Sequence, residues 1–393
     1  MTGVLLTLVA AMLLVPVAVL LAQVLLAGAR VRPTDAAARR PRVAVLVPAH
    51  DEAAGIAASL ATVAPQLLAG DRLLVVADNC SDDTASVAAQ AGAEVVERRD
   101  AERRGKGYAL DFGLQRLRAD PPEVVLIVDA DCLVDPGAVE RLARDCARHG
   151  RPIQALYLMQ SPPDAGLKTR IAEFAWVVKN QVRPLGMLRA GLPCQLMGTG
   201  MAFPWVQIEH APLASGHIVE DLQLGLDLAA AGTPPRFCPE ARVTSRFPVD
   251  AGGLAAQRTR WEHGHLGVIA TQAPRLLWRA LAQARPALAA LVLDLCVPPL
   301  AALTLLLLAV LAATALFAAV GGDAGPLQLA ALGVVGLLAA VLLAWAGHAR
   351  HIVSLRELLG APLYVLGKIP IYARWFKARQ VEWVRTKRDD RSQ

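Results

Sequence analysis

The sequence predicts an α/β domain, with a mostly parallel sheet and helices on both faces, carried by membrane-spanning helices. Between residues 42 and 270, short apolar runs alternate with helical or polar stretches, which is the pattern of such a sheet. Apolar segments long enough to cross a bilayer lie on both sides of this region. Hydrophobic residues form 55% of the 393-residue chain, which is too apolar for an ordinary soluble enzyme.

The first apolar segment, residues 4–27, is expected to span the membrane. A signal peptide is the alternative, but the run is long and lacks a positive start. Five arginines follow between residues 30 and 42, and the positive-inside bias places the next segment in the cytoplasm. The net charge of +6 gathers beside apolar segments, which indicates a membrane face rather than nucleic acid. We therefore expect a transmembrane helix in residues 1–29 and a cytoplasmic domain in residues 30–272.

Short runs rich in Val, Ile and Leu predict the strands of this domain, and Ala-rich stretches predict its helices. The expected strands are residues 43–48, 73–78, 94–97, 124–129 and 153–159. The expected helices include residues 53–68 and 84–91, and residues 172–188 are a further helical segment that we expect near the membrane.

The C-terminal part is expected to return to the membrane. After an interfacial linker, residues 273–286, two spanning helices are predicted in residues 287–347, joined by a short outside loop. Asp294 marks either a functional site in the membrane or a position near the interface, and the ragged preceding run favours the interface. Residues 348–393 are expected to be a cytoplasmic interfacial segment and a basic tail, since Lys368 and Pro370 interrupt the apolar pattern there.

The most informative feature is a carboxylate pair, Asp129 and Asp131, directly after the buried strand. Ligands of open α/β sheets bind at the carboxyl ends of strands, and two carboxylates there suit Mg²⁺ or Mn²⁺. A polar turn is the alternative. Asp51 and Glu52 close the first strand and Asp78 closes the second, so three acidic loops share one edge of the sheet. The string 81–84 after Asp78 also suits a helix cap.

Three further strings carry candidate site residues. Lys106 lies in the basic, Gly-rich loop 103–107, which is either a phosphate-binding loop or a solvated turn. Glu220 and Asp221 precede a helical stretch. They supply either a general base for catalysis or a cap for the helix. The string 257–261 contains two arginines and a tryptophan, which suit either a phosphate clamp with a stacking ring or a juxtamembrane anchor.

In this order, the strings resemble the membrane-bound family 2 glycosyltransferases, the group that includes cellulose and hyaluronan synthases and ceramide glucosyltransferases. The resemblance covers residues 43–261 and implies a GT-A-type fold. Its last motif, QxxRW, is matched by Gln257, Arg258, Thr259, Arg260 and Trp261. By the resemblance, this string holds the donor diphosphate and the acceptor end, with Gln257, Arg258, Arg260 and Trp261 as its binding residues.

The resemblance also implies a donor site. Asp51, Glu52 and Asp78 would contact the nucleoside, and Lys106 would help to hold the base or the phosphates. Asp129 and Asp131 resemble the family's DxD motif, which binds the diphosphate through Mg²⁺ or Mn²⁺.

The catalytic base is implied by the family's TED-type motif. Asp221 matches that base, with Glu220 beside it, and residues 198–200 occupy the place of the acceptor-side loop. The sequence departs from the family in Asp51, where Asn is usual, and in Val219, where Thr is usual. Its membrane part is also small for a polymer channel.

The expected function is inverting transfer of a hexose from a nucleoside diphosphate sugar, with UDP-sugar as the expected donor. The acceptor is expected to be a lipid-linked sugar or a polysaccharide at the cytoplasmic (inner) membrane, in a multi-pass protein. A processive polysaccharide synthase with export partners is the alternative within the enzyme class. A membrane-anchored nucleotide sensor and a small transporter are the alternatives outside it.

Overall fold

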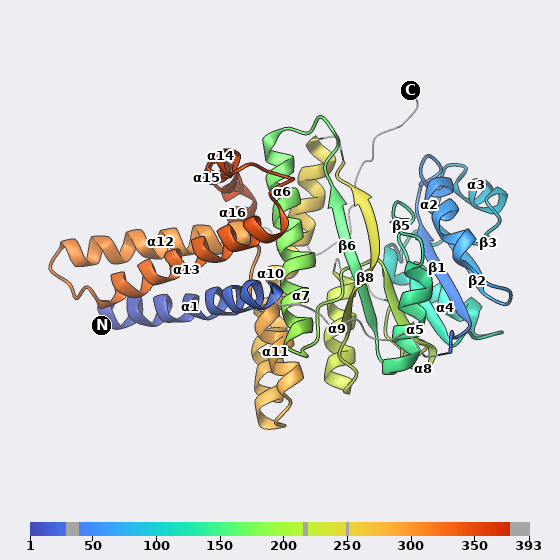
Figure 1. Cartoon of the computed structure of the whole chain (residues 1–393), viewed down its shortest axis with the longest axis horizontal. Helices are drawn as coiled ribbons and strands as arrows, with labels where there is room; N and C mark the ends of the chain where they lie inside the picture. The colour runs from blue at the N-terminus through green and yellow to red at the C-terminus, as the bar shows by residue number, and fades with distance from the viewer. Residues whose placement is uncertain (29–38, 215–218, 249–250, 378–393) are drawn as a thin grey trace. The chain divides into compact units, whose positions relative to one another are not determined.

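The computed structural model describes residues 1–28, 39–214, 219–248 and 251–377, which divide into two compact units (Figure 1). The sheet unit contains the described residues of 39–162 and 193–264. The membrane unit contains residues 1–28, 163–192 and 265–377. The chain therefore enters the membrane unit at residue 163, returns to the sheet unit at residue 193, and enters the membrane unit again at residue 265.

The sheet unit is built on one eight-stranded sheet with the order β3-β2-β1-β4-β7-β6-β8-β5. The strands are β1 Val43–Ala49, β2 Arg72–Asp78, β3 Glu94–Arg98, β4 Val124–Ile127, β5 Leu133–Val134, β6 Ile153–Gln160, β7 Met201–Pro204 and β8 Arg236–Arg246. Strands β3, β2, β1 and β4 are parallel, as are β6 and β8, whereas β7 runs antiparallel to both neighbours and β5 runs antiparallel to β8. The predicted α/β class is confirmed.

Five strands lie where the sequence predicts them, and three were missed. β5 and β7 are only two and four residues long, too short for a periodic signal. β8 carries several charged side chains, so its composition is unlike that of a buried strand. Its pairing with β6 therefore depends on neighbours that are distant in sequence.

The strand register brings several loops to one edge, which we call the carboxyl edge. β1 pairs with β2 and β4 in parallel, so the chain leaves all three strands at this edge. β7 runs the other way, and its first residue, Met201, pairs with Ile127, the last residue of β4. The segment before β7 therefore lies beside the segment after β4.

Helices cover the sheet and fix the loops at its carboxyl edge. They are α2 Ile56–Val63, the 3₁₀ turn η1 Ala64–Gln66, α3 Thr84–Gln90, α4 Lys106–Leu117, α5 Ala138–His149, α8 Trp205–Ile208 and α9 Glu220–Ala231, with α10 Ala251–Ala282 continuing into the membrane unit. Leu110 and Leu114 of α4 pack into the same buried cluster as Leu46 and Val76 of the sheet. A Cβ at Gly113 would lie 2.4 Å from Leu46 Cδ1, so a larger residue there would force the buried Leu46 side chain to shift.

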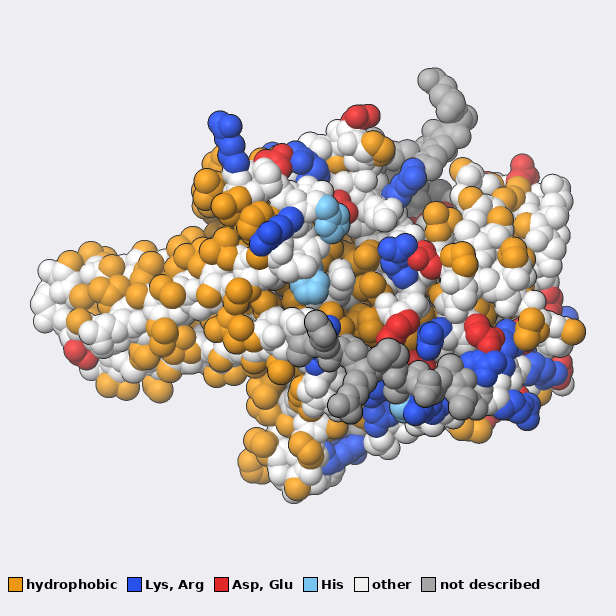
Figure 2. All heavy atoms as spheres, in the orientation of Figure 1, with side chains coloured by type: hydrophobic (Ala, Val, Ile, Leu, Met, Phe, Trp, Pro, Cys, Tyr) orange, Lys and Arg blue, Asp and Glu red, His pale blue; other side chains and the backbone are white. Residues whose placement is uncertain are grey.

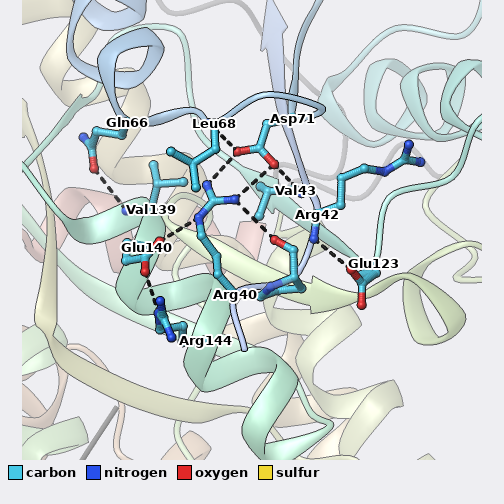
Figure 3. Close-up of polar contacts among 11 residues, drawn as sticks. Arg40, Arg42, Val43, Gln66, Leu68, Asp71, Glu123, Val139, Glu140 and Arg144 are labelled. Carbon is cyan, nitrogen blue, oxygen red and sulfur yellow. Dashed lines mark hydrogen bonds and ion pairs between the residues drawn. The ribbon is translucent and has the colours of Figure 1, made fainter. Parts of the chain in front are cut away.

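The opposite edge, which we call the amino edge, is closed by a buried charge network (Figure 3). Arg40 lies 2.6 Å from Asp71 Oδ2 and 2.6 Å from Glu140 Oε2. Asp71 also accepts the backbone N–H groups of Val43 and Leu68, at 2.9 and 2.8 Å. The Asp71 side chain is only 1% exposed, and its hydrogen bonds and Arg40 lower its pKa although burial opposes them.

In the membrane unit, three helices are long and apolar enough to cross a membrane: α1 Thr2–Ala27, α12 Leu300–Ala319 and α13 Gly325–His348. They lie side by side, and apolar side chains cover their surface (Figures 1 and 2). The apolar run that begins at residue 287 is interrupted before α12: α11 Pro286–Leu295 is a separate short helix, and the chain breaks at Pro298 and Pro299.

The other helices of this unit are short. They are α6 Leu167–Val177, the π-helical turn η2 Val178–Val182, α7 Arg183–Arg189, α14 Leu355–Leu358, α15 Ala361–Leu366 and α16 Ile369–Lys377. Exposed apolar side chains recur from α14 to the start of α16, at Leu355, Leu359, Leu363, Leu366 and Ile369. None of these three helices is long enough to span a bilayer.

Asp294, the charge within the C-terminal apolar run, lies buried between three helices. Arg183 Nη2 of α7 is 2.8 Å from Asp294 Oδ1, and Gln23 Nε2 of α1 donates to the same oxygen at 2.7 Å. Helices α1 and α7 can approach each other closely because residue 186 of α7 is glycine. A Cβ at this position would lie 2.1 Å from the Gln23 carbonyl oxygen of α1. The carboxylate therefore ties α1, α7 and α11 together.

Candidate active site

The centre of the carboxyl edge is an ion pair between Lys106 and Asp129. Asp129 lies two residues beyond the end of β4, and Lys106 is the first residue of α4. Lys106 Nζ is 2.5 Å from Asp129 Oδ1 and donates a hydrogen bond to the Gly198 carbonyl oxygen at 2.7 Å. One ammonium group thus joins the segment after β4 to the segment before β7.

The loop 198–200 is held against this pair by its own backbone. Gly198 has φ +91°, and a Cβ there would lie 3.4 Å from Asp221 Oδ2 and 3.8 Å from Lys106 Nζ. The next residue, Thr199, is fully buried, and its Oγ1 accepts the backbone N–H of Asp129 at 3.0 Å. The loop therefore bonds to Asp129 and lies close to the predicted base, Asp221.

A buried amide on β6 supports this loop. Gln154 Oε1 accepts the Met197 N–H at 2.8 Å, and Gln154 Nε2 donates to the Thr199 carbonyl at 2.9 Å. Our sequence reasoning missed Gln154. The signal was present, because an amide in a mostly apolar strand must find partners when it is buried.

Glu220 and Asp221 begin α9, where the helix dipole favours negative charge. Burial and the Asp221 charge raise the pKa of Glu220 from 4.5 to about 7, although Lys106 opposes the shift. Burial alone would lower the pKa of Lys106, but Asp129, Glu220 and Asp221 together raise it, so Lys106 stays charged. The structure therefore brings together four predicted residues: Lys106, Asp129, Glu220 and Asp221.

The acidic groups after β4 suit a hard divalent cation. Oxygen and sulfur atoms of Asp129, Asp131 and Cys132 lie within 4.8 Å of one another. Burial raises the pKa of Cys132 well above its ordinary value, and Asp131 adds to this, so its thiol stays protonated and is a poor ligand. The two carboxylates remain, and they are the ligand type that Mg²⁺ and Mn²⁺ prefer.

A second cluster at the same edge contains the predicted nucleoside contacts. Asp78 is buried, and its Oδ1 lies 2.6 Å from Arg98 Nη1, a partner that the sequence did not reveal. Asp51 has φ +52° and accepts the Ser81 N–H at 2.6 Å. The Glu52 N–H donates to Thr84 Oγ1 at 2.8 Å. These bonds join the loops after β1 and β2.

The predicted string 257–261 lies on α10. Arg260 and Trp261 are half-buried there. The side chains of Gln257 and Arg258 fall outside the described residues, so the roles of this string remain predictions.

The chain is similar in sequence to a known protein family. The model of the family described as "Glycosyltransferase like family 2" matches residues 41–264. Uncharacterized glycosyltransferases of Mycobacterium tuberculosis and Mycobacterium bovis are 39% identical over 103 residues, which is 26% of this chain and 43% of each relative's length.

One solved structure shows the fold. A mannosyltransferase from Pyrobaculum calidifontis, in complex with GDP-Man and Mn²⁺, superposes with a TM-score of 0.56 at 20% identity, covering 95% of this chain and all of that one. Glucosyl-3-phosphoglycerate synthase from Mycobacterium tuberculosis has a TM-score of 0.37 at 22% identity, covering 57% of this chain and 79% of that one. The family model spans more than half of the chain, and the chain therefore belongs to glycosyltransferase family 2.

Proposed function

We propose that this protein transfers a hexose from a nucleoside diphosphate sugar to a membrane-associated acceptor, with inversion at the anomeric carbon. The observation that carries the proposal is the position of the loop 198–200. Its backbone and Thr199 side chain bond to Lys106 and Asp129. On its other side, a Cβ placed at Gly198 would lie 3.4 Å from Asp221 Oδ2. A donor-binding carboxylate and a base thus lie around one loop.

Asp129 and Asp131 are the residues that would hold Mg²⁺ or Mn²⁺ in this reaction. The cation supplies charge neutralisation at the leaving diphosphate. Lys106 adds a positive charge, and the Arg260 guanidinium is proposed as a further clamp, together with Gln257, Arg258 and Trp261. UDP-sugar is the donor that we propose, with GDP-Man as the first competitor because the Pyrobaculum mannosyltransferase binds it.

Asp221 is the proposed general base. It accepts the proton of an acceptor hydroxyl as that oxygen forms a bond to the anomeric carbon. The bond from this carbon to the diphosphate oxygen breaks on the opposite face, and the nucleoside diphosphate leaves with the electron pair. Gly198, which has no side chain, leaves room for the acceptor beside Asp221. Asp51, Glu52 and Asp78 are proposed to bind the nucleoside.

The membrane unit suggests where the acceptor comes from. Three helices are long and apolar enough to span a bilayer, and a lipid-linked sugar is therefore within reach of an anchored enzyme. The arginines between residues 30 and 42 favour a cytoplasmic sheet unit at the inner membrane. The exposed apolar side chains between Leu355 and Ile369 suit a segment that lies in the interface.

The test is transfer from a panel of labelled nucleotide sugars, UDP-glucose and GDP-mannose included, in membranes containing the full chain. Each donor is assayed with Mn²⁺, with Mg²⁺ and with a chelator. Asp221→Asn should reduce transfer by about 10²–10⁴-fold, the usual contribution of a general base.

Asp227→Asn is the matched control, because Asp227 is an exposed carboxylate on the same helix that bonds to Gln223. It should transfer at the unmodified rate. Folded protein that transfers from no donor would overturn the proposal, as would an Asp221→Asn variant that transfers at the control rate.

A further inference from the structure

Lys106 makes two contacts that a phosphate-binding lysine does not need. Its Nζ lies 2.5 Å from Asp129 Oδ1, and it also donates to the Gly198 carbonyl at 2.7 Å. The Lys106 and Asp129 side chains are 21% and 31% exposed, although the Asp129 Oδ1 atom that faces the ammonium group is itself buried. The pair therefore lies at the rim of the site, where a ligand can reach its exposed atoms.

Several carboxylates lie around Lys106. Asp129, Glu220 and Asp221 all act on this one ammonium group, and Asp131 lies close to Asp129. A divalent cation would bind the same kind of oxygen atoms that Lys106 contacts. Mg²⁺ and Mn²⁺ bind carboxylate oxygens directly, at about 2.0–2.2 Å, which is the space that the ammonium group uses on Asp129.

We propose that Lys106 competes with the divalent cation for Asp129 and yields it only when the donor diphosphate arrives, so that cation and donor bind together. This inference rests on the proposed function. The diphosphate oxygens offer Lys106 a replacement for the carboxylate. Asp129 is then released to the cation. Lys106 is thus a positioning residue. Because it also bonds to the Gly198 carbonyl, its change of partner would alter the position of the loop beside Asp221.

The proposal makes cation binding conditional. Mn²⁺ alone binds weakly, because it must displace an ammonium group from Asp129 without compensation. Mn²⁺ with a nucleoside diphosphate binds more strongly, and part of that gain comes from Lys106 rather than from phosphate ligation. Removing the Lys106 charge should therefore strengthen binding of Mn²⁺ alone and shrink the gain from nucleotide.

The experiment is titration of purified full-length protein in detergent with Mn²⁺, following free Mn²⁺ by electron paramagnetic resonance, without nucleotide and with UDP or GDP. Lys106→Met should bind Mn²⁺ alone at least about fivefold more tightly than the unmodified protein, at the lower end of usual coupling strengths. Lys106→Arg, which keeps the charge, should bind it as weakly as the unmodified protein.

Arg104→Met is the matched control, since it removes an exposed positive charge from the same loop. It should leave binding of Mn²⁺ alone unchanged. Unchanged or weaker Mn²⁺ binding in Lys106→Met, or equal tightening in Arg104→Met, overturns the proposal. If Lys106→Met does not fold, Lys106→Gln gives the same readout. The titration needs no turnover, so its result is separate from that of the transfer assay.

Discussion

The two edges of the sheet use the same kinds of charged residues in opposite ways. At the amino edge, Arg40 is enclosed by Asp71 and Glu140, and the Asp71 side chain is 1% exposed with its oxygens bonded to Arg40 and to backbone N–H groups (Figure 3). At the carboxyl edge, Lys106 is surrounded by Asp129, Glu220 and Asp221, and the side chain of its partner Asp129 is 31% exposed. Buried charges that are bonded to one another hold a structure, whereas several carboxylates gathered at a partly exposed edge suit the binding of a ligand.

The membrane unit contains the same kind of buried ion pair as the amino edge. Arg183 and Asp294 are 9% and 6% exposed, and Gln23 adds a third bond to the carboxylate. Asp294 is therefore not available to a ligand in the way that Asp129 is. The charged residue in this apolar run therefore links helices, and does not indicate a catalytic or binding site.

The largest expected effect concerns Asp129 itself. Asp129→Asn should lower transfer by about 10²-fold or more, because the variant loses a cation ligand and the partner of Lys106. Its thermal midpoint should stay near that of the unmodified protein, since one of the crowded carboxylates is neutralised. Parallel assays of initial rate and thermal unfolding measure both. A collapse of the midpoint would mean that the carboxyl edge is a structural network after all.

The converse effect is expected at the amino edge. Asp71→Asn should reduce the free energy of unfolding by about 2–3 kcal/mol, because it leaves Arg40 buried with only Glu140 as a charged partner. The turnover of the folded fraction should not change. Asp120→Asn is the control, because Asp120 pairs with Arg42 in solvent and should matter little. Loss of turnover in folded Asp71→Asn would remove the distinction between the edges.

A smaller effect is expected in the pH dependence of stability. Burial and Asp221 raise the pKa of Glu220 from 4.5 to about 7, so the folded protein binds more protons than the unfolded chain between these values. Stability should therefore fall as pH rises from about 5 to 7.5. Thermal midpoints across this range should show a flatter profile for Glu220→Gln. Identical profiles would mean that Glu220 is not in an acid-crowded site.

The sequence predicted the carboxyl edge better than it predicted the contacts there. Apolar runs that end in Asp78 and Asp129 locate the edge, because strand polarity alone brings such ends together. The partners of these residues were not predictable in the same way. Arg98 beside Asp78, and Gln154 beneath the loop 198–200, are chosen by pairing between segments far apart in sequence.

The same limit applies to the missed strands and to the membrane unit. β8 is recognisable as a strand only beside β6, since its own residues are mixed in character. The hydrogen bond between Gln23 and Asp294 joins residues 271 positions apart. The sequence around a single polar residue in an apolar helix does not indicate which residue it bonds to.

The most direct test of the account is donor binding without turnover. Asp221→Asn, which retains the carboxylates after β4, is titrated calorimetrically with nucleotide sugar, with Mn²⁺ and with a chelator, and compared with Asp221→Asn carrying Asp129→Asn. The account predicts Mn²⁺-dependent binding in the single variant that is lost in the double variant. Equal binding in both variants, or binding that ignores the chelator, would contradict a cation and donor site at the carboxyl edge.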